Sequence, residues 1–359
     1  MRILHVITSL KTGGAERLMV DLLPLIRDKG QHVVELLVFD GIRTPFLEKL
    51  EEEGIKIITL SKDGNVYNPM NVFRLVRYIS SYDLIHTHNT ACQLFVPIAK
   101  MLSCAKTVLV TTEHNTTNRR RDKIWFKPID RWMYNQYATT ICISEKASCN
   151  LKAYIGDKHR IVTVFNGIDT KRFIRPVKNI SSQNHYVVAM VAGFRPQKDQ
   201  DTLLKSFTFL PDNYKLQLVG SGQRESQLKV LCRDLNLTDR VDFMGVRQDV
   251  PDILEQSDIV VLSSHWEGLS LSSIEGMASG RPFVASDVDG LHEMVSGAGV
   301  LFEHGNDKVL AEKIQWLCEH PDEYRKVAQC CQDKARQYDI SVMAEKYLKL
   351  YNRLLYESR

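Results

Sequence analysis

The sequence is poor in the features that mark several large classes of protein. Its eight cysteines include no C-x-x-C pair, so neither a zinc ribbon nor a dithiol redox site is indicated. No segment approaches the roughly 20 apolar residues of a membrane-spanning helix. The N-terminal stretch MRILHVITSL is too short and too interrupted for a signal peptide and predicts a strand instead. We therefore expect a cytoplasmic protein with free thiols.

Strong charge and a dinucleotide fingerprint are also missing. The net charge is +4, with 25% charged residues, which is too weak to indicate a nucleic-acid partner but allows contact with anionic substrates or a membrane surface. No G-x-G-x-x-G motif occurs, which argues against an NAD-dependent oxidoreductase. A chain of 359 residues, 44% of them hydrophobic, is long enough for two domains.

Short apolar runs alternate with helical patterns along nearly the whole chain, which predicts an α/β fold with two Rossmann-like parallel sheets and a central cleft. We predict an N-terminal domain over residues 1–172, a polar linker over 173–185, a C-terminal domain over 186–337, and a final helix over 338–359 that packs back on the N-terminal domain. The runs that predict strands are RILHVIT, HVVELLVF, KIITL, YDLIHTH, KTVLVTTEH, ATTICIS, RIVTVFNG, YVVAMVAGF, KLQLVGSG, VDFMG, DIVVLSS, PFVASD and GVLF.

Two junctions in the first half carry candidate site residues. Gly13 and Gly14 lie between a strand and a helix, where backbone amides could approach a phosphate, although a tight turn explains them as well. His86 and His88 end an apolar strand, and residues two apart on a strand face the same side. A metal pair is conceivable, but no third ligand is visible at a useful spacing, and strand-end histidines are often structural.

The second half offers cations and carboxylates. Arg195 and Lys198, in GFRPQKD, could neutralise a diphosphate, or could be ordinary solvated cations. Glu267 stands eight positions before Glu275 in HWEGLSLSSIEG. Ser272-Ser-Ile-Glu275 fits a capping box, so Glu275 has a purely structural explanation. In the alternative, Glu267 accepts sugar hydroxyls, Glu275 binds a ribose, and the helix amides near Leu271 hold phosphate.

Another acidic pair has a simpler interpretation. Asp287-Val-Asp289 matches a metal-binding D-x-D pattern of other sugar-transferring enzymes, but it follows the last major strand. We interpret it as a loop.

In combination, these motifs resemble glycosyltransferase family four, whose members are retaining GT-B-fold enzymes that use nucleotide sugars. The segments that carry the resemblance are GGAER, IHTHN, FNGID, GFRPQKD, LVGSG, VDFMG, SSHWEGLSLSSIEGMASGRPFVASD and DGLHEMV. They follow the family order along nearly the whole chain and are most specific within residues 186–302.

The resemblance assigns roles to individual residues. It implies that Glu267 faces the transferred sugar, that Glu275 binds the ribose, and that Arg195 and Lys198 bind the diphosphate without a metal or other cofactor. It places His88, rather than His86, near the reacting sugar. The remaining donor-binding residues that it implies are Gly13, Gly14, Gly220, Val246, Gly268, Ser270, Leu271 and Ser272. The turn MGVRQDV would read the base, for which we expect uridine. Retention without an obvious carboxylate nucleophile favours front-face substitution.

The acceptor side is less specific. Residues 118–137, NRRRDKIWFKPIDRWMYNQY, interleave cations with apolar residues at helical spacing. Most of the apolar residues are expected in the core. Alternatively, this segment forms a basic, aromatic-edged surface for a polyprenyl-diphosphate-linked glycan or an anionic membrane. His114, Arg119, Arg120 and Arg121 are the candidate acceptor-binding residues.

Two other functions fit the same fold. A nucleotide-sugar epimerase would convert the donor without an acceptor, and a non-catalytic subunit would bind the donor only. The complete set of candidate site residues favours a glycosyltransferase that moves a hexose or N-acetylhexosamine to a saccharide acceptor.

Overall fold

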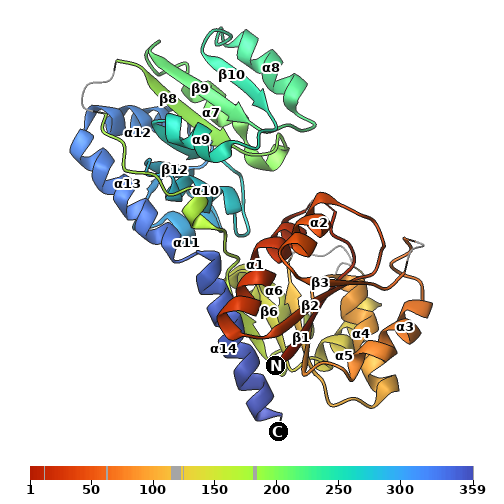
Figure 1. The fold of residues 1–359 in the computed structure, drawn as a ribbon. Helices are drawn as coiled ribbons and strands as arrows, with labels where there is room; N and C mark the ends of the chain where they lie inside the picture. Colours follow the sequence, from red (N-terminus) through yellow and green to blue (C-terminus); the bar gives the residue numbers. More distant parts are fainter. Residues whose placement is uncertain (12, 62–63, 115–122, 124, 181–183, 359) are drawn as a thin grey trace. The chain divides into compact units, whose positions relative to one another are not determined.

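The computed structural model describes residues 1–11, 13–61, 64–114, 123, 125–180 and 184–358. Contacts divide the chain into two compact units (Figure 1). Unit 1 comprises Met1–Gly167 and Ile340–Arg359, and unit 2 comprises Ile168–Asp339. Among the described residues, no helix is both long enough and apolar enough to cross a membrane.

Unit 1 contains a seven-stranded parallel sheet in the order β3-β2-β1-β4-β5-β6-β7. Its strands are β1 (Arg2–Ile7), β2 (Val33–Val38), β3 (Lys56–Thr59), β4 (Leu84–Thr87), β5 (Val108–Glu113), β6 (Thr139–Cys142) and β7 (Ile161–Thr163). Its helices are α1 (Gly14–Gly30), α2 (Pro45–Glu52), α3 (Met70–Ile79), α4 (Thr90–Ser103), α5 (Phe126–Asn135), α6 (Glu145–Ile155) and α14 (Ile340–Glu357).

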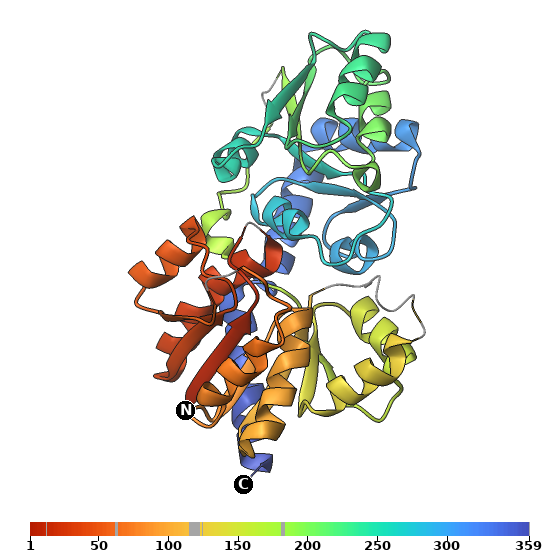
Figure 2. The same cartoon turned by 90° about the vertical axis from the view of Figure 1, so that its right-hand side faces the viewer.

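Helices cover both faces of this sheet, which explains why its strands are apolar throughout rather than alternating. Along β1, Ile3 and Ile7 enter one hydrophobic cluster with α1, α2 and α14, whereas Leu4 and Val6 enter another with α3 to α6. The C-terminal helix α14 packs on α1. Figure 2 shows α4, in orange, and α14, in blue, on opposite sides of the strands.

Unit 2 contains a six-stranded parallel sheet in the order β10-β9-β8-β11-β12-β13. Its strands are β8 (Tyr186–Val191), β9 (Tyr214–Val219), β10 (Val241–Gly245), β11 (Ile259–Leu262), β12 (Phe283–Ser286) and β13 (Val300–Phe302). Its helices are α7 (Gln200–Ser206), α8 (Glu225–Asp234), α9 (Val250–Gln256), α10 (Leu271–Ala278), α11 (Leu291–Val295), α12 (Asp307–Glu319) and α13 (Pro321–Arg336), with short 3₁₀ turns at η2 (Thr170–Arg172) and η3 (Pro196–Lys198).

The α/β prediction with two parallel sheets is confirmed, and every apolar run predicted as a strand contains one. Residues 173–180, from the segment interpreted as a linker, belong to unit 2. Phe173 and Ile180 are buried in its hydrophobic core.

Candidate active site

Each sheet has one point where the strand order reverses, between β1 and β4 in unit 1 and between β8 and β11 in unit 2. Loops that leave the carboxyl ends of such neighbouring strands diverge, and ligands of open α/β sheets bind in the crevice that results. The predicted site residues follow these strands. His88 comes directly after β4, Lys198 ends the turn η3 after β8, and Glu267 follows β11.

Lys198 and Glu267, 69 positions apart in the sequence, form an ion pair in unit 2. The Lys198 Nζ lies 2.5 Å from Glu267 Oε1, and the Ser264 hydroxyl donates to the same oxygen at 2.6 Å. The Glu267 side chain is only 6% exposed. Among the residues that the structure describes, its second oxygen, Oε2, has one long hydrogen-bond contact, 3.5 Å from Gln197 Nε2. Glu267 therefore retains an acceptor for a hydroxyl group.

Hydrogen bonds between the two loops hold this pair together. The Ser263 hydroxyl donates to the carbonyl of Asp199 at 2.8 Å, and the His265 amide donates to the carbonyl of Gln197 at 2.8 Å. These two hydrogen bonds link the loop after β11 to the η3 turn, and they position Lys198 beside Glu267.

Arg195, the residue before η3, has an exposed side chain. Within the described part of the chain its guanidinium has no ion-pair partner. A free guanidinium three positions from an ammonium group is suited to an anion with several oxygens, such as a diphosphate.

The helix after Glu267 begins two residues earlier than the capping box Ser272-Ser-Ile-Glu275 would require. Ser270 is the N-cap of α10, and its hydroxyl accepts a hydrogen bond from the Ser273 amide at 3.4 Å. Leu271 and Ser272 are therefore inside the first turn, and Glu275 is in the second. The capping-box interpretation of Glu275 is wrong, because its side chain is too far along the helix to reach back to the cap.

Two glycines of unit 2 make room for close backbone contacts. A β-carbon at Gly220, which has φ +139°, would lie 2.1 Å from the carbonyl oxygen of Ala192. A β-carbon at Gly290, which has φ +85°, would lie 2.4 Å from the carbonyl oxygen of Glu267 and 2.5 Å from that of Gly268. Gly290 thus supports the turn that carries Glu267.

The turn predicted to read the base lies between β10 and α9. Its Val246 is 76% exposed.

A pocket of about 340 Å³ lies at the carboxyl ends of β1, β4 and β5 in unit 1. Its lining residues are Gly14, Ala15, Glu16, His88, Asn89, Thr90, Gln93, Glu113 and His114. It unites three of the predicted positions, Gly14, His88 and His114, and excludes His86. Gly13 adjoins it as the N-cap of α1. Arg119, Arg120 and Arg121 lie outside the described residues.

Behind this pocket lies a cluster of histidines that includes one residue the motifs do not contain. His5 of β1 is paired in register with His86 of β4. The Nδ1 of His5 lies 2.9 Å from Nε2 of His88, and the Nδ1 of His88 lies 3.1 Å from Nε2 of His114. In the sequence, His5 is marked only as a polar residue between apolar residues of its strand. Its hydrogen-bond partner His88 is 83 positions away, so the sequence could not identify the pair.

His86 is held separately. Its Nδ1 is 2.6 Å from the Tyr351 hydroxyl, and its Nε2 is 2.7 Å from Thr112 Oγ1. Three histidines, His5, His86 and His88, have ring nitrogens within 4.8 Å of one another, so the third candidate ligand absent from the motif is present in the fold. Both nitrogens of His86 and of His88 are nevertheless engaged in hydrogen bonds, which favours a hydrogen-bond network over a metal site.

Burial keeps these imidazoles neutral. Desolvation lowers the pKa of His5 to about 3 and the pKa of His114 to about 4. Desolvation, reinforced by the neighbouring histidines, lowers the pKa of His86 and of His88 well below the usual range. The histidines of the unit 1 pocket are therefore neutral and lie among the glutamates Glu16 and Glu113, whereas the unit 2 site has the cations Arg195 and Lys198.

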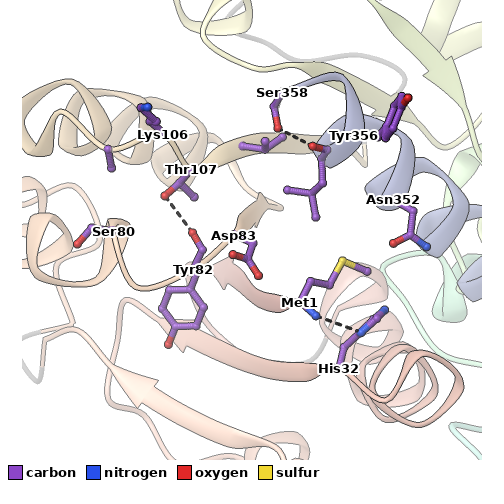
Figure 3. Close-up of a pocket in the computed structure, with 13 residues that line it drawn as sticks. Met1, His32, Ser80, Tyr82, Asp83, Lys106, Thr107, Asn352, Tyr356 and Ser358 are labelled. Atoms are coloured by element: carbon purple, nitrogen blue, oxygen red, sulfur yellow. Dashed lines mark hydrogen bonds between the residues drawn. The ribbon is translucent and has the colours of Figure 1, made fainter.

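A larger pocket of about 710 Å³ lies at the opposite, amino-terminal edge of the unit 1 sheet. Figure 3 shows Met1, Asp83 and Thr107 around it, each just before a strand, together with Asn352 and Tyr356 of α14. Ligands of open parallel sheets bind at the carboxyl ends of the strands. We therefore place the candidate site at the smaller pocket.

The described part of residues 118–137 differs from expectation. Met133 is buried, but Trp125 is 82%, Ile129 47% and Trp132 36% exposed. The expectation that most of these apolar residues lie in the core is wrong, because α5 turns only its Met133 and Tyr134 side into the cluster with α3 and α4.

Comparison with known families accounts for nearly the whole chain. Residues 12–172 match the family described as Glycosyltransferase Family 4, and residues 171–336 match the family described as Glycosyl transferases group 1. The chain belongs to glycosyltransferase family 4. The two matched families together cover both units of this glycosyltransferase, in agreement with the resemblance of its motifs.

Two relatives of this glycosyltransferase act on diphosphoundecaprenol-linked sugars according to their names. It is 26% identical over 270 residues to the UDP-Gal:alpha-D-GlcNAc-diphosphoundecaprenol alpha-1,3-galactosyltransferase of Escherichia coli, covering 70% of this chain and 68% of that protein. It is 31% identical over 217 residues to the N,N'-diacetylbacillosaminyl-diphospho-undecaprenol alpha-1,3-N-acetylgalactosaminyltransferase of Campylobacter jejuni, covering 60% of this chain and 55% of that protein.

Solved structures with the same fold cover this glycosyltransferase almost completely. The crystal structure of Anabaena HepE in complex with UDP has a TM-score of 0.82 at 23% identity, covering 98% of this chain and all of that chain. A glycosyltransferase from Rickettsia africae has a TM-score of 0.82 at 20% identity, covering 99% and 98%. The GT-B prediction is confirmed.

Proposed function

We propose that this glycosyltransferase is a retaining enzyme that moves a hexose or N-acetylhexosamine from a UDP-sugar to a saccharide acceptor, in a lipid-linked glycan. The observation that carries the donor half is the Lys198–Glu267 pair with Arg195 beside it. The names of the relatives support a diphosphoundecaprenol-linked acceptor. The UDP in the HepE crystal structure supports the nucleotide.

The donor-site residues divide the work by charge. Arg195 and Lys198 bind the diphosphate and stabilise the negative charge that develops on it as the sugar departs. The free amides at the start of α10 add positive potential, and no metal ion is required for this task. Glu267 accepts hydroxyls of the transferred sugar, Glu275 those of the ribose. The acceptor hydroxyl attacks from the face that the diphosphate leaves, because the carboxylate of Glu267 is assigned to the far hydroxyls.

A direct test is transfer by the full-length protein. UDP-glucose, UDP-galactose and their N-acetyl forms would each be incubated with a short-chain polyprenyl-diphosphate-linked GlcNAc, with and without EDTA. We expect an α-linked product from one donor, identified by its anomeric proton coupling in NMR, and no effect of EDTA. A β-linked product would contradict retention. Epimer formation without acceptor would identify an epimerase, and donor binding without turnover would identify a binding subunit.

Lys198→Ala and Lys205→Ala form a matched pair for this assay. Lys205 is an exposed lysine of α7 in the same unit, so its loss removes the same charge away from the site. We expect Lys198→Ala alone to abolish most of the transfer.

The exposed face of α5 supports a peripheral contact with an anionic membrane. Trp125, Ile129 and Trp132 recur at the spacing that aligns side chains on one side of a helix. Lys123 and Arg131 are exposed nearby, and the described part of this segment has no exposed acidic side chain. Aromatic residues with adjacent cations are typical of surfaces that lie in the headgroup region.

Vesicle flotation tests this contact. The full-length protein should float with vesicles that contain about one-third phosphatidylglycerol and less with pure phosphatidylcholine. Trp125→Gln with Trp132→Gln should abolish flotation, whereas Trp316→Gln, which changes a tryptophan of unit 2 that is 41% exposed, should not. Equal flotation of all variants would contradict the assignment.

A further inference from the structure

Three histidines form an unbranched hydrogen-bonded series that ends at the unit 1 pocket; we call it the histidine chain (His5, His88 and His114). His5 is fully buried in β1, His88 is 3% exposed, and His114 follows β5. Both contacts in the histidine chain join Nδ1 of one ring to Nε2 of the next. The rings of His5 and His88 also stack, with centroids 5.2 Å apart and planes inclined by 10°.

This linkage constrains where the protons lie. A neutral imidazole has one N–H donor and one bare acceptor nitrogen, and each hydrogen bond needs one of each. If Nδ1 of His5 holds a proton, Nε2 of His88 must be bare, so that the proton of His88 is on Nδ1. The same reasoning then places the proton of His114 on Nδ1. If Nε2 of His5 holds the proton instead, the proton lies on Nε2 in all three rings.

Both ends of the histidine chain carry an unpaired ring nitrogen, but His114 lines the pocket and His5 does not. At the buried end, Nε2 of His5 has no hydrogen-bond partner among the described residues. At the pocket end, Nδ1 of His114 has none either, and the same holds for Oδ1 of Asn89, another pocket residue. Unpaired buried polar atoms are costly unless a ligand or water completes them. The pocket end is therefore where a hydroxyl-bearing ligand would bind.

We propose that His5 is a positioning residue that fixes, through His88, the tautomer of His114, and so decides whether His114 Nδ1 donates to or accepts from a sugar hydroxyl in this pocket. The sugar is the part of this inference that rests on the proposed function. The coupling of the three tautomers does not depend on it. His86 does not take part in this coupling, since its two ring nitrogens form hydrogen bonds with Tyr351 and Thr112.

The test is nitrogen-15 NMR of the full-length protein with labelled histidine at pH 7.5, where the chemical shifts distinguish a protonated ring nitrogen from a bare one. The rings would be assigned with His5→Asn, His88→Gln and His114→Gln. In the unsubstituted protein we expect one tautomer for each ring and the same nitrogen protonated in all three. Protons on different nitrogens of His88 and His114 in the unsubstituted protein would overturn the proposal.

Variants of His5 then separate positioning from packing. His5→Leu removes the hydrogen-bonding atom and should convert His88 and His114 to tautomer mixtures, whereas His5→Asn keeps a polar group near the place of Nδ1 and should restore one tautomer. His159→Gln is the control, because His159 contacts Thr140 at 2.8 Å in the same unit but lies outside the histidine chain. A single unchanged tautomer in His5→Leu would contradict the coupling.

Activity supplies an independent reading. We expect His5→Leu to lower kcat/KM for transfer by about 10-fold, the effect of one misdirected hydrogen bond, and His5→Asn to recover most of it. If no donor is turned over while the three tautomers agree, the proposed function fails and the coupling stands. If transfer occurs but the tautomers disagree, the coupling alone fails.

Discussion

The two units place chemically different groups at the carboxyl ends of similar sheets. In unit 1 the loops after β4 and β5 carry the neutral imidazoles of His88 and His114, whereas in unit 2 the loops after β8 and β11 carry an ammonium, a guanidinium and a carboxylate. A doubly wound sheet supplies the position, and the few residues beyond each strand supply the chemistry. Cations suit an anionic nucleotide sugar, and neutral imidazoles suit the hydroxyls of a saccharide.

The largest expected difference between the units is their response to acid. An unfolded histidine has a pKa near 6.5, and His5 in the folded protein has a pKa of about 3. Below pH 6.5 the unfolded chain therefore binds a proton that the folded unit excludes, so the free energy of unfolding rises with pH up to about 6.5 and is flat above. At pH 5, His5 alone should cost unit 1 about 2 kcal/mol, at about 1.4 kcal/mol per pH unit. His86, His88 and His114 act in the same direction.

Hydrogen exchange followed by mass spectrometry measures both units in one sample. After correction for intrinsic exchange rates, peptides from β1 and β4 should lose protection between pH 7 and pH 5, and peptides from β8 and β11 should keep it. Among the described residues, unit 2 has no buried histidine. Equal losses in the two units would refute the contrast.

Removing the charge of a donor-site residue should lower the rate of transfer strongly. Lys198→Ala and Glu267→Gln should each lower kcat by about 100- to 1,000-fold, because each removes a group that stabilises developing charge or orients the sugar. The fold should remain intact, as circular dichroism would verify. Near-normal rates in both variants would contradict the assignment of Lys198 and Glu267 to the donor site.

Backbone support for Glu267 should have a smaller effect. Gly290→Ala would press a β-carbon against the carbonyl oxygens of Glu267 and Gly268, and a displaced Glu267 should reduce kcat by about 10- to 100-fold. Gly297 has a similar φ, +77°, with nothing within 4 Å of an added β-carbon. Gly297→Ala should therefore show only the cost of the left-handed backbone, about 1 kcal/mol in unfolding. Equal activities of the two variants would contradict this role of Gly290.

The smallest effect concerns the cap of α10. Ser270→Ala removes the acceptor for the Ser273 amide and should destabilise unit 2 by about 1 kcal/mol, seen as a lower unfolding temperature. Ser226→Ala is the comparison, since Ser226 is exposed inside α8, where alanine is the better helix former. If Ser270→Ala is no less stable than Ser226→Ala, the helix does not depend on this cap.

The features of the fold that could be predicted were those encoded locally. Strands buried on both faces are continuous apolar runs, which is why β1, β4, β8 and β11 were recognisable. The motif around Glu267 and Glu275 pointed to a donor site before any contact was known. By contrast, the sequence left two caps open for α10, Ser272 of the capping box and a start near Leu271, because Ser270 and Ser272 are both acceptable caps and only the backbone geometry, which selects Ser270, distinguishes them.

Helical periodicity had a similar limit at α5. The spacing of Trp125, Ile129 and Trp132 indicated that they share a face, but periodicity cannot say which face meets the sheet. Packing decided that point by burying Met133 and Tyr134.

The sequence by itself determined the order of strands and helices, the family and the residues beyond the strands, because apolar periodicity and short motifs are local properties. Only the tertiary structure decided that Lys198 meets Glu267, that His5 joins His88 and His114, and that α5 exposes its aromatic side. Those contacts join residues far apart in the chain, or depend on which face is buried. They form only when parallel strands take their places in a sheet, and their strengths depend on the water that the folded protein excludes.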